Sequence, residues 1–183
     1  MKRKQVVGAL GPIMVGLLVA VALKTCVIFN AVVPTESMEP TIMPGDRLIG
    51  SKLSYRFGEP ERGDIITFHG PEGSGSYLVK RIVGLPGETV TIVSGEVFID
   101  GESVPLMEEY INPDETPTGD CGPYVVPEGC YFVMGDNRNH SYDSRYWTAT
   151  NFVEKDEIIS KILFRYYPTI SGVERNVARE RDS

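Results

Sequence analysis

Residues 77–84 are the most informative stretch for the architecture, because a strand-like pattern there carries two cations. The stretch reads Tyr77-Leu78-Val79-Lys80-Arg81-Ile82-Val83-Gly84. Its β-branched and aromatic residues are typical of a strand. Alternation along a strand places Leu78, Lys80 and Ile82 on one face, and Arg81 on the other, at the surface or in a salt bridge. A lysine on an apolar face either reaches solvent or is buried with a lowered pKa.

Short apolar runs separated by Gly, Pro and Asp continue through the chain and predict β-structure throughout. We expect strands at residues 47–52, 65–68, 77–83, 89–93, 96–99, 131–134 and 158–166. Ser94-Gly95 and Asp100-Gly101 suit tight turns, so residues 88–104 are expected to form a hairpin and its return. The pattern predicts a mainly β fold, an antiparallel barrel or folded sheet, behind one N-terminal transmembrane helix.

The N-terminal part contains an apolar segment of membrane length. Val6 to Leu23 includes no charged residue, and 18 helical residues span about 27 Å, close to a hydrocarbon core. Lys2, Arg3 and Lys4 precede the segment and predict a cytoplasmic N-terminus by the positive-inside rule. The predicted parts are a cytoplasmic N-terminus at 1–5, a transmembrane anchor at 6–29, an extracytoplasmic domain at 30–170 and a flexible charged tail at 171–183.

Two other interpretations of the apolar segment are weaker. A cleavable signal peptide would be processed at Ala20-Val21-Ala22, but its apolar region would be longer than usual. Leu23-Lys24-Thr25-Cys26 has some likeness to a lipid-attachment box, yet a lysine inside such a box is uncharacteristic. A membrane anchor located in the cell membrane is therefore the preferred interpretation.

Composition and charge restrict the class of protein. The 183 residues, 42% hydrophobic and 23% charged, fit one globular domain plus an anchor. The net charge is −7, and every acidic residue lies at or after Glu36. Without the four cations before Glu36, the chain carries 14 basic and 25 acidic residues, a balance of −11. Such an acidic domain repels phosphate backbones, so we expect no nucleic-acid partner.

Cysteine and histidine give little indication of further chemistry. Cys121 and Cys130 flank a predicted turn, and both a disulfide and two free thiols are compatible with that spacing. Two histidines, His69 and His140, without a CxxC pair predict no metal site, and we expect no cofactor. Residues 105–123 form a long acidic connection, which we interpret as an exposed insertion without chemistry.

Ser37 is a candidate nucleophile, because it lies just past the apolar segment between Pro34 and Pro40. If Lys80 is buried and uncharged, it supplies the base that a serine hydroxyl needs. Residues 134–147 add a third segment, dense in polar groups, that holds the only tryptophan. Such density favours a polar network that supports a site.

Four segments, in this order behind the anchor, together make the chain resemble the type I signal peptidases of peptidase family S26. They are residues 37–41, 62–68, 80–87 and 135–145. This family consists of membrane-bound serine endopeptidases that remove signal peptides from exported proteins. A short domain with one anchor is similar to its Gram-positive branch.

The resemblance implies a role for individual residues. Ser37 matches the acylating nucleophile, Lys80 the general base, and Thr35 a hydroxyl that joins the Ser37 N–H in the oxyanion hole. Ser141 matches the residue that orients the lysine amine. The implied supporting residues are Asp143 and Arg145, a salt-bridge network, with Asp136 and Arg138, which fix the same loop.

The expected substrate is a preprotein signal peptide bound as an added β-strand, whose −1 and −3 side chains face one wall. Shallow pockets there would select small residues such as alanine, and we expect Met38 and Ile82 to bind the substrate. Membrane lipid and the protein-export machinery are the other expected partners.

Three other functions compete with this interpretation. A histidine-based hydrolase would pair Ser37 with His140, near Asp143. A self-cleaving Ser-Lys repressor protease would need a DNA-binding domain in place of the anchor. The alternative from another class is a catalytically inactive, membrane-tethered β-domain that binds peptides, against which the intact Ser37 and Lys80 argue.

Overall fold

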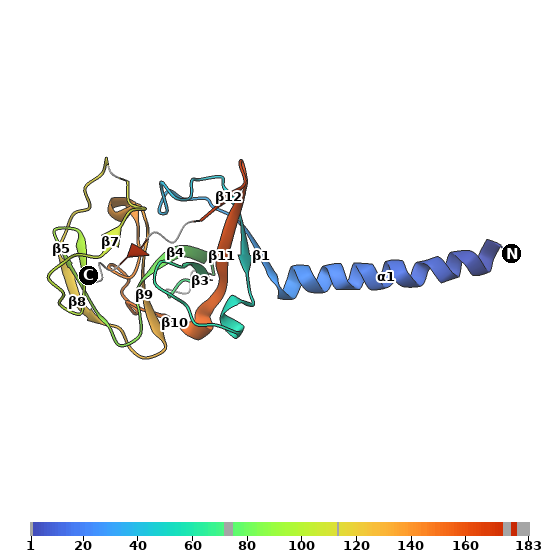
Figure 1. Ribbon diagram of the computed structural model, residues 1–183, viewed down its shortest axis with the longest axis horizontal. Coiled ribbons are helices and arrows are strands. Elements are labelled where there is room, and N and C mark those ends of the chain that lie inside the picture. Colours follow the sequence, from blue (N-terminus) through green and yellow to red (C-terminus); the bar gives the residue numbers. More distant parts are fainter. Residues whose placement is uncertain (1, 72–74, 113, 174–176, 179–183) are drawn as a thin grey trace.

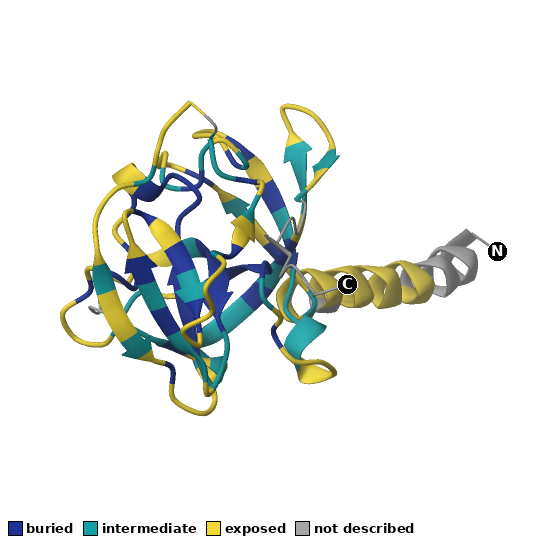
Figure 2. Cartoon of the chain, turned by 60° about the vertical axis from the view of Figure 1, so that its left-hand side comes forward, coloured by how far each residue is buried: buried dark blue, intermediate teal, exposed yellow. Residues whose placement is uncertain are grey.

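One long helix precedes a β-domain and extends away from it (Figure 1). The structure is a computed structural model that describes residues 2–71, 75–112, 114–173 and 177–178, without the side chains of residues 2–10, 22 and 177–178. Helix α1 spans Lys2–Cys26, and Val27 alone separates it from strand β1, Ile28–Val32. The described side chains of α1 are exposed (Figure 2).

The anchor predicted over residues 6–29 stays a prediction. Among the helical residues that the structure describes, no stretch has both the length and the apolar character to cross a bilayer. Residues 6–10 of the predicted span have no described side chains. The helix also ends earlier than expected, because Ile28 and Phe29 already pair with β2, and the Phe29 side chain is buried.

The largest sheet in the described residues has eight strands, all paired antiparallel. Its order is β1-β2-β11-β3-β4-β9-β10, with β12 beside β11. The bounds are β2 Arg47–Ser51, β3 Ile65–His69, β4 Tyr77–Gly84, β9 Cys130–Met134, β10 Val153–Glu154, β11 Ile158–Tyr167 and β12 Ser171–Gly172. The order leaves β1 and β10 as edges, so of the two predicted forms it fits an open folded sheet.

Two smaller sheets complete the domain. They consist of β6 (Glu96–Ile99), β5 (Thr89–Val93) and β8 (Cys121–Val125), and of β7 (Met107–Glu108) with β13 (Val177–Ala178). The predicted hairpin at 88–104 is confirmed: Ser94 and Gly95 both have positive φ between β5 and β6, as a two-residue turn requires. Short 3-10 helices lie at Ser54–Arg56, Arg138–His140 and Lys155–Glu157.

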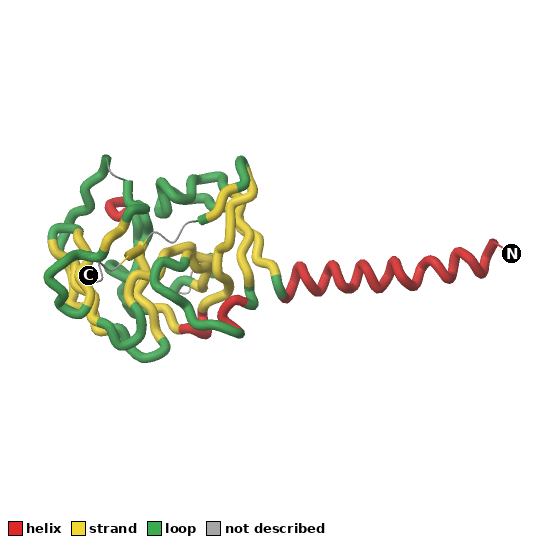
Figure 3. The backbone as a smooth tube through the Cα atoms, viewed as in Figure 1, coloured by secondary structure: helices red, strands yellow, loops and turns green. Residues whose placement is uncertain are grey.

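The seven predicted strands are all present, each within one residue at either end. The described residues hold six further strands that were not predicted, and two of them, β12 and β13, fall in the segment expected to be a flexible tail. Residues 174–176 and 179–183 of that segment lie outside the described residues. Long loops join the strands over much of the domain (Figure 3), and Cys121 and Cys130 are free thiols.

Three apolar clusters form the core. One joins the β5-β6 hairpin to β4 and β9 through Val83, Val90 and Phe132. A second surrounds Trp147 on the other side of β4. The third lies under the segment between β1 and β2, where Met38 and Ile42 are buried against neighbouring strands. This third cluster anchors the segment that carries Ser37.

Candidate active site

Ser37 lies in a tight turn between β1 and β2. The Glu39 N–H donates to the Glu36 carbonyl at 3.0 Å, and the Ile42 N–H donates to the Met38 carbonyl at 2.9 Å. The next side chain, Met38, is 1% exposed and fixes the turn to the core, while Ser37 itself is half-buried. The sequence therefore holds a serine hydroxyl at the surface of a rigid turn.

Lys80 meets Ser37 directly. Its Nζ donates a hydrogen bond to the Ser37 Oγ at 2.7 Å. The lysine stands on β4 opposite Ile66 of β3, and it is 3% exposed. Burial lowers the pKa of Lys80 to about 8, against the raising effects of the Asp143 and Asp136 carboxylates. Leu78 and Ile82 pack in one cluster, as the predicted alternation requires.

Thr35 contributes a second hydroxyl beside the nucleophile. Its Oγ1 lies 3.5 Å from the Ser37 Oγ, and the residue is exposed. This position suits a donor to a group that occupies the space next to Ser37. The structure therefore brings the three residues Thr35, Ser37 and Lys80 together, as the sequence predicted.

The loop after β9 supports the turn that carries Ser37. The Asn137 N–H donates to the Ser37 carbonyl at 3.2 Å, and the Asn137 Nδ2 donates to the Glu36 carbonyl at 3.2 Å. Gly135 lies against the same turn, since a Cβ there would be 2.3 Å from the Ser37 carbonyl oxygen. Asn137 was not predicted as a site residue, although it lies inside the polar segment that the sequence singled out.

Asp143 and Arg145 form the predicted salt bridge inside this loop. The Arg145 Nε and Nη2 donate to the two Asp143 oxygens at 2.8 and 2.9 Å. Asp143 also accepts the Gly135 N–H at 2.9 Å, and the Arg145 Nη2 donates to the Arg138 carbonyl at 2.7 Å. Both residues are buried, so the pair fixes both ends of the loop.

Asp136 pairs with a residue that the sequence left open between a surface and a salt-bridge role. Arg81 donates through Nε and Nη2 to the two Asp136 oxygens at 2.8 and 2.7 Å, and both side chains are 0% exposed. Burial alone would lower the pKa of Arg81, but the hydrogen bond and charge of Asp136 raise it. The salt-bridge interpretation is confirmed, and the surface location is wrong, because Asp136 lies within reach.

The interpretation of residues 105–123 as an exposed insertion without chemistry needs correction. Glu108 pairs with Arg138, whose Nη1 donates to the Glu108 Oε2 at 2.8 Å, and the Tyr110 ring lies 3.9 Å from the Arg81 Cζ. Tyr110 is 7% exposed. No signal in the sequence pointed to this contact, because the matched segments hold as many carboxylates as arginines and the pairing with Glu108 depends on the tertiary fold.

Three predicted residues lie differently from their expected roles. The Ser141 Oγ is buried without a hydrogen-bond partner, so no bond to the Lys80 amine is present. Met38 and Ile82, expected to bind substrate, are 1% and 0% exposed and belong to two apolar clusters. A substrate would reach either side chain only after the core around it opened.

His140 does not belong to the Ser37 centre. Its side chain is 58% exposed, and its Nδ1 lies 4.0 Å from a Glu36 carboxylate oxygen.

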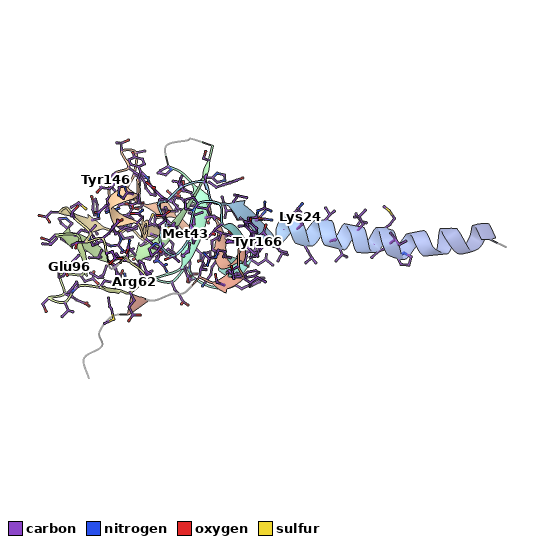
Figure 4. The ribbon with its side chains drawn as sticks, turned by 90° about the horizontal axis from the view of Figure 1, so that it is seen from above. Lys24, Met43, Arg62, Glu96, Tyr146 and Tyr166 are labelled. Atoms are coloured by element: carbon purple, nitrogen blue, oxygen red, sulfur yellow. The ribbon has the colours of Figure 1, made fainter. Side chains whose placement is uncertain are left out.

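Among the described residues, no group of three or more potential ligands could hold a metal ion. A small depression of about 20 Å³ lies beside the loop, between Glu39, Glu115 and Asn137. Figure 4 shows Lys24 at the end of α1 that meets the β-domain, while the other labelled residues, Met43 and Arg62 among them, lie in the domain.

The sequence profile described as "Signal peptidase, peptidase S26" matches residues 6–167. A "Probable signal peptidase I-1" of Synechocystis sp. (strain ATCC 27184 / PCC 6803 / Kazusa) is 43% identical over 85% of this chain and 80% of its own. A "Signal peptidase I" of Bacillus caldolyticus is 38% identical over 91% of this chain and 94% of its own.

A signal peptidase I from Enterococcus faecalis V583, known from a crystal structure, is 37% identical and covers 57% of this chain and 97% of its own, with a TM-score of 0.47. So low a score supports no conclusion about the fold. The family profile and the curated relatives decide the class: the chain belongs to the signal peptidases of peptidase family S26. It is therefore a peptidase with a mainly antiparallel β-domain.

Proposed function

We propose that this protein is a membrane-bound serine endopeptidase that removes signal peptides from preproteins, with Ser37 as nucleophile and Lys80 as general base. One observation carries the proposal: the buried Lys80 amine lies 2.7 Å from the Ser37 hydroxyl. A base within hydrogen-bond reach of a hydroxyl is the arrangement that activates a serine.

The lowered pKa makes the amine a usable base. A lysine with its ordinary pKa near 10.4 is neutral in only about 0.4% of molecules at pH 8. With a pKa of about 8, roughly half of the Lys80 amines are neutral at that pH. Burial in the domain therefore gives a gain of about two orders of magnitude in the reactive form.

The reaction proceeds in two halves. Neutral Lys80 accepts the Ser37 proton while the Ser37 Oγ bonds to the scissile carbonyl carbon, and the Ser37 N–H and Thr35 hydroxyl stabilise the oxyanion. The protonated lysine gives its proton to the departing amine as the peptide bond breaks. Lys80 then accepts a proton from water, whose oxygen attacks the acyl-enzyme, and returns that proton to the Ser37 Oγ as the ester bond breaks.

The supporting residues keep the reacting groups aligned. Asp143 and Arg145 hold the loop after β9, and that loop holds the Ser37 carbonyl through Asn137. Ser141 lies next to Gly135 of this loop. It stays the proposed residue that orients the Lys80 amine in the substrate complex. Such pre-formed supports reduce the reorganisation needed at the transition state.

Substrate selection follows from crowding near this centre. A signal peptide bound as an added strand presents its −1 and −3 side chains to the same wall, so small residues such as alanine fit best. Met38 and Ile82 stay the proposed substrate-contact residues, and because both are buried in apolar clusters, a bound peptide would contact them only where those clusters open.

α1 is the proposed single-pass anchor, with a cytoplasmic N-terminus and the β-domain on the extracytoplasmic face. Exposed apolar side chains such as Ile13, Leu17 and Leu18 support membrane contact, and the apolar sequence continues back to Val6. The expected partners are preprotein signal peptides, membrane lipid and the export machinery. Extraction of membranes at high pH tests the anchor: the protein should stay in the pellet, and release into the wash would contradict it.

The proposed function is tested with detergent-solubilised protein and a preprotein that has alanine at −1 and −3. Wild type should cleave it, Ser37→Ala and Lys80→Ala should not, and His140→Ala should retain most activity. Because only neutral Lys80 reacts, kcat/KM should rise with pH through about 8. Equal cleavage by wild type and both dyad variants rejects the proposal, and loss of activity in His140→Ala would favour the histidine-based rival.

A further inference from the structure

The segment at residues 105–123 makes contacts that the proposed mechanism does not use. Several of its residues reach the loop after β9: Glu108 pairs with Arg138, Tyr110 contacts Arg138 and also Arg81 of β4, and Thr118 donates to the Asn139 side chain. The Asn139 Nδ2 returns a hydrogen bond to the Thr116 carbonyl at 3.1 Å. The insertion is therefore attached to the loop along its length and not only at one point.

We infer that Glu108 and Tyr110 are positioning residues for the Ser37 and Lys80 centre, acting through Arg138 and Arg81. This inference rests on the proposed function of that centre. The insertion, interpreted from the sequence as free of chemistry, then has a role in turnover.

The path from the insertion to Ser37 consists of short polar contacts. Arg138, paired with Glu108, donates through Nε to the Gly135 carbonyl at 3.2 Å. Between Gly135 and Arg138, the Asn137 N–H holds the Ser37 carbonyl. Movement of Arg138 would therefore move the turn that aims the Ser37 hydroxyl.

Tyr110 connects this path to β4. Its hydroxyl accepts a hydrogen bond from the Arg138 Nη2 at 3.2 Å and donates one to Glu108, while its ring lies 3.9 Å from the Arg81 Cζ. Arg81 follows Lys80 in the strand. One aromatic ring thus contacts the supports of both reacting residues, and cation-π contact in a buried place is favourable.

The charges explain why the insertion must supply a carboxylate. Arg138 is 3% exposed, and the side chain of Glu108 is 6% exposed. Without Glu108, Arg138 would be a buried cation that competes with Arg81 for Asp136. Removal of one partner from a buried pair is expensive for that reason.

Glu108→Gln tests the inference, with Glu109→Gln as the matched control. Glu109 is the adjacent residue, has the same chemistry and is exposed. In Glu108→Gln, kcat per folded molecule should fall on the order of 10²-fold with KM unchanged, because a misplacement of about 1 Å has that effect. Glu109→Gln should match wild type in both constants.

Tyr110→Phe is the second variant, in case Glu108→Gln does not fold. It keeps the ring over Arg81 and removes only the hydroxyl, so kcat should fall less, on the order of 10-fold, with KM and the folded fraction unchanged. The inference is overturned if either variant keeps the wild-type kcat per folded molecule. In that case any loss of total activity would only follow the loss of folded protein. Failure of the proposed function would instead show as cleavage that persists in Ser37→Ala.

Discussion

Lys80 and Arg81 are neighbours on β4 and both side chains are buried, yet their surroundings have opposite effects on their charge. The Lys80 amine donates to a neutral hydroxyl, and burial lowers its pKa to about 8. The Arg81 guanidinium donates to both oxygens of Asp136, and its pKa is raised. Burial therefore lowers the pKa of a cation on one face of the strand, and a bidentate carboxylate retains the charge of the cation on the other.

Replacement of Lys80 by a permanent cation tests the first half of this contrast and should have the largest effect. In Lys80→Arg, the guanidinium stays protonated and cannot accept the Ser37 proton. Cleavage should fall about 10⁴-fold, the upper end of what a general base contributes. A peptide-cleavage assay measures this, with Lys155→Arg as a surface control of the same chemistry. Activity above a tenth of wild type in Lys80→Arg would exclude Lys80 as the base.

Removal of the carboxylate tests the second half. Asp136→Asn leaves Arg81 buried and charged without its partner, so the free energy of unfolding should fall by about 3 to 5 kcal/mol. Urea denaturation followed by circular dichroism measures the change. The control is Glu59→Gln at the exposed pair with Lys155, where the expected loss is about 0 to 1 kcal/mol. Equal losses at the two pairs would mean that the buried Asp136 carboxylate stabilises the protein no more than an exposed one does.

The pH dependence of stability gives the smallest of the three effects. The folded pKa of Lys80 is about 8 and the unfolded value about 10.4, so between these pH values the unfolded chain binds more protons. Stability contributed by this residue therefore rises with pH through that window, by on the order of 3 kcal/mol. Comparison with Lys80→Met at pH 7 and pH 10.5 isolates the contribution. A constant difference between the two proteins would mean that Lys80 is hydrated.

Local patterns predicted much of the fold. The β5-β6 hairpin follows from Ser94-Gly95, where both residues need positive φ, and the strand at 77–84 follows from its β-branched residues. β1 was missed because Ile28 and Phe29 continue the apolar run of the helix before them. Their strand conformation depends on pairing with Gly50 and Ser51 of β2, which local periodicity does not reveal.

The site residues likewise divide into those that local sequence predicted and those that only the tertiary fold reveals. Ser37 and Lys80 were predicted because the serine lies between two prolines just past the apolar segment and the lysine stands within an apolar strand, and the structure joins them. Glu108 and Tyr110 were missed because an acidic, proline-containing segment is typical of a surface loop. Only the tertiary fold brings that segment onto Arg138 and Arg81. The burial of Met38 and Ile82 could likewise not be predicted from the sequence, because a methionine or an isoleucine suits a pocket wall and a core equally well.

The junction between α1 and β1 has a mechanical consequence. Val27 is the single residue between them, and the Lys52 side chain donates to the Thr25 carbonyl at 2.9 Å across that joint. The β-domain is thereby coupled stiffly to the helix end, and β1 extends about 17 Å from it toward the turn with Ser37. With α1 anchored as proposed, the distance between the membrane surface and the Ser37 hydroxyl is fixed, so substrate peptides are cleaved at a constant distance from the lipid.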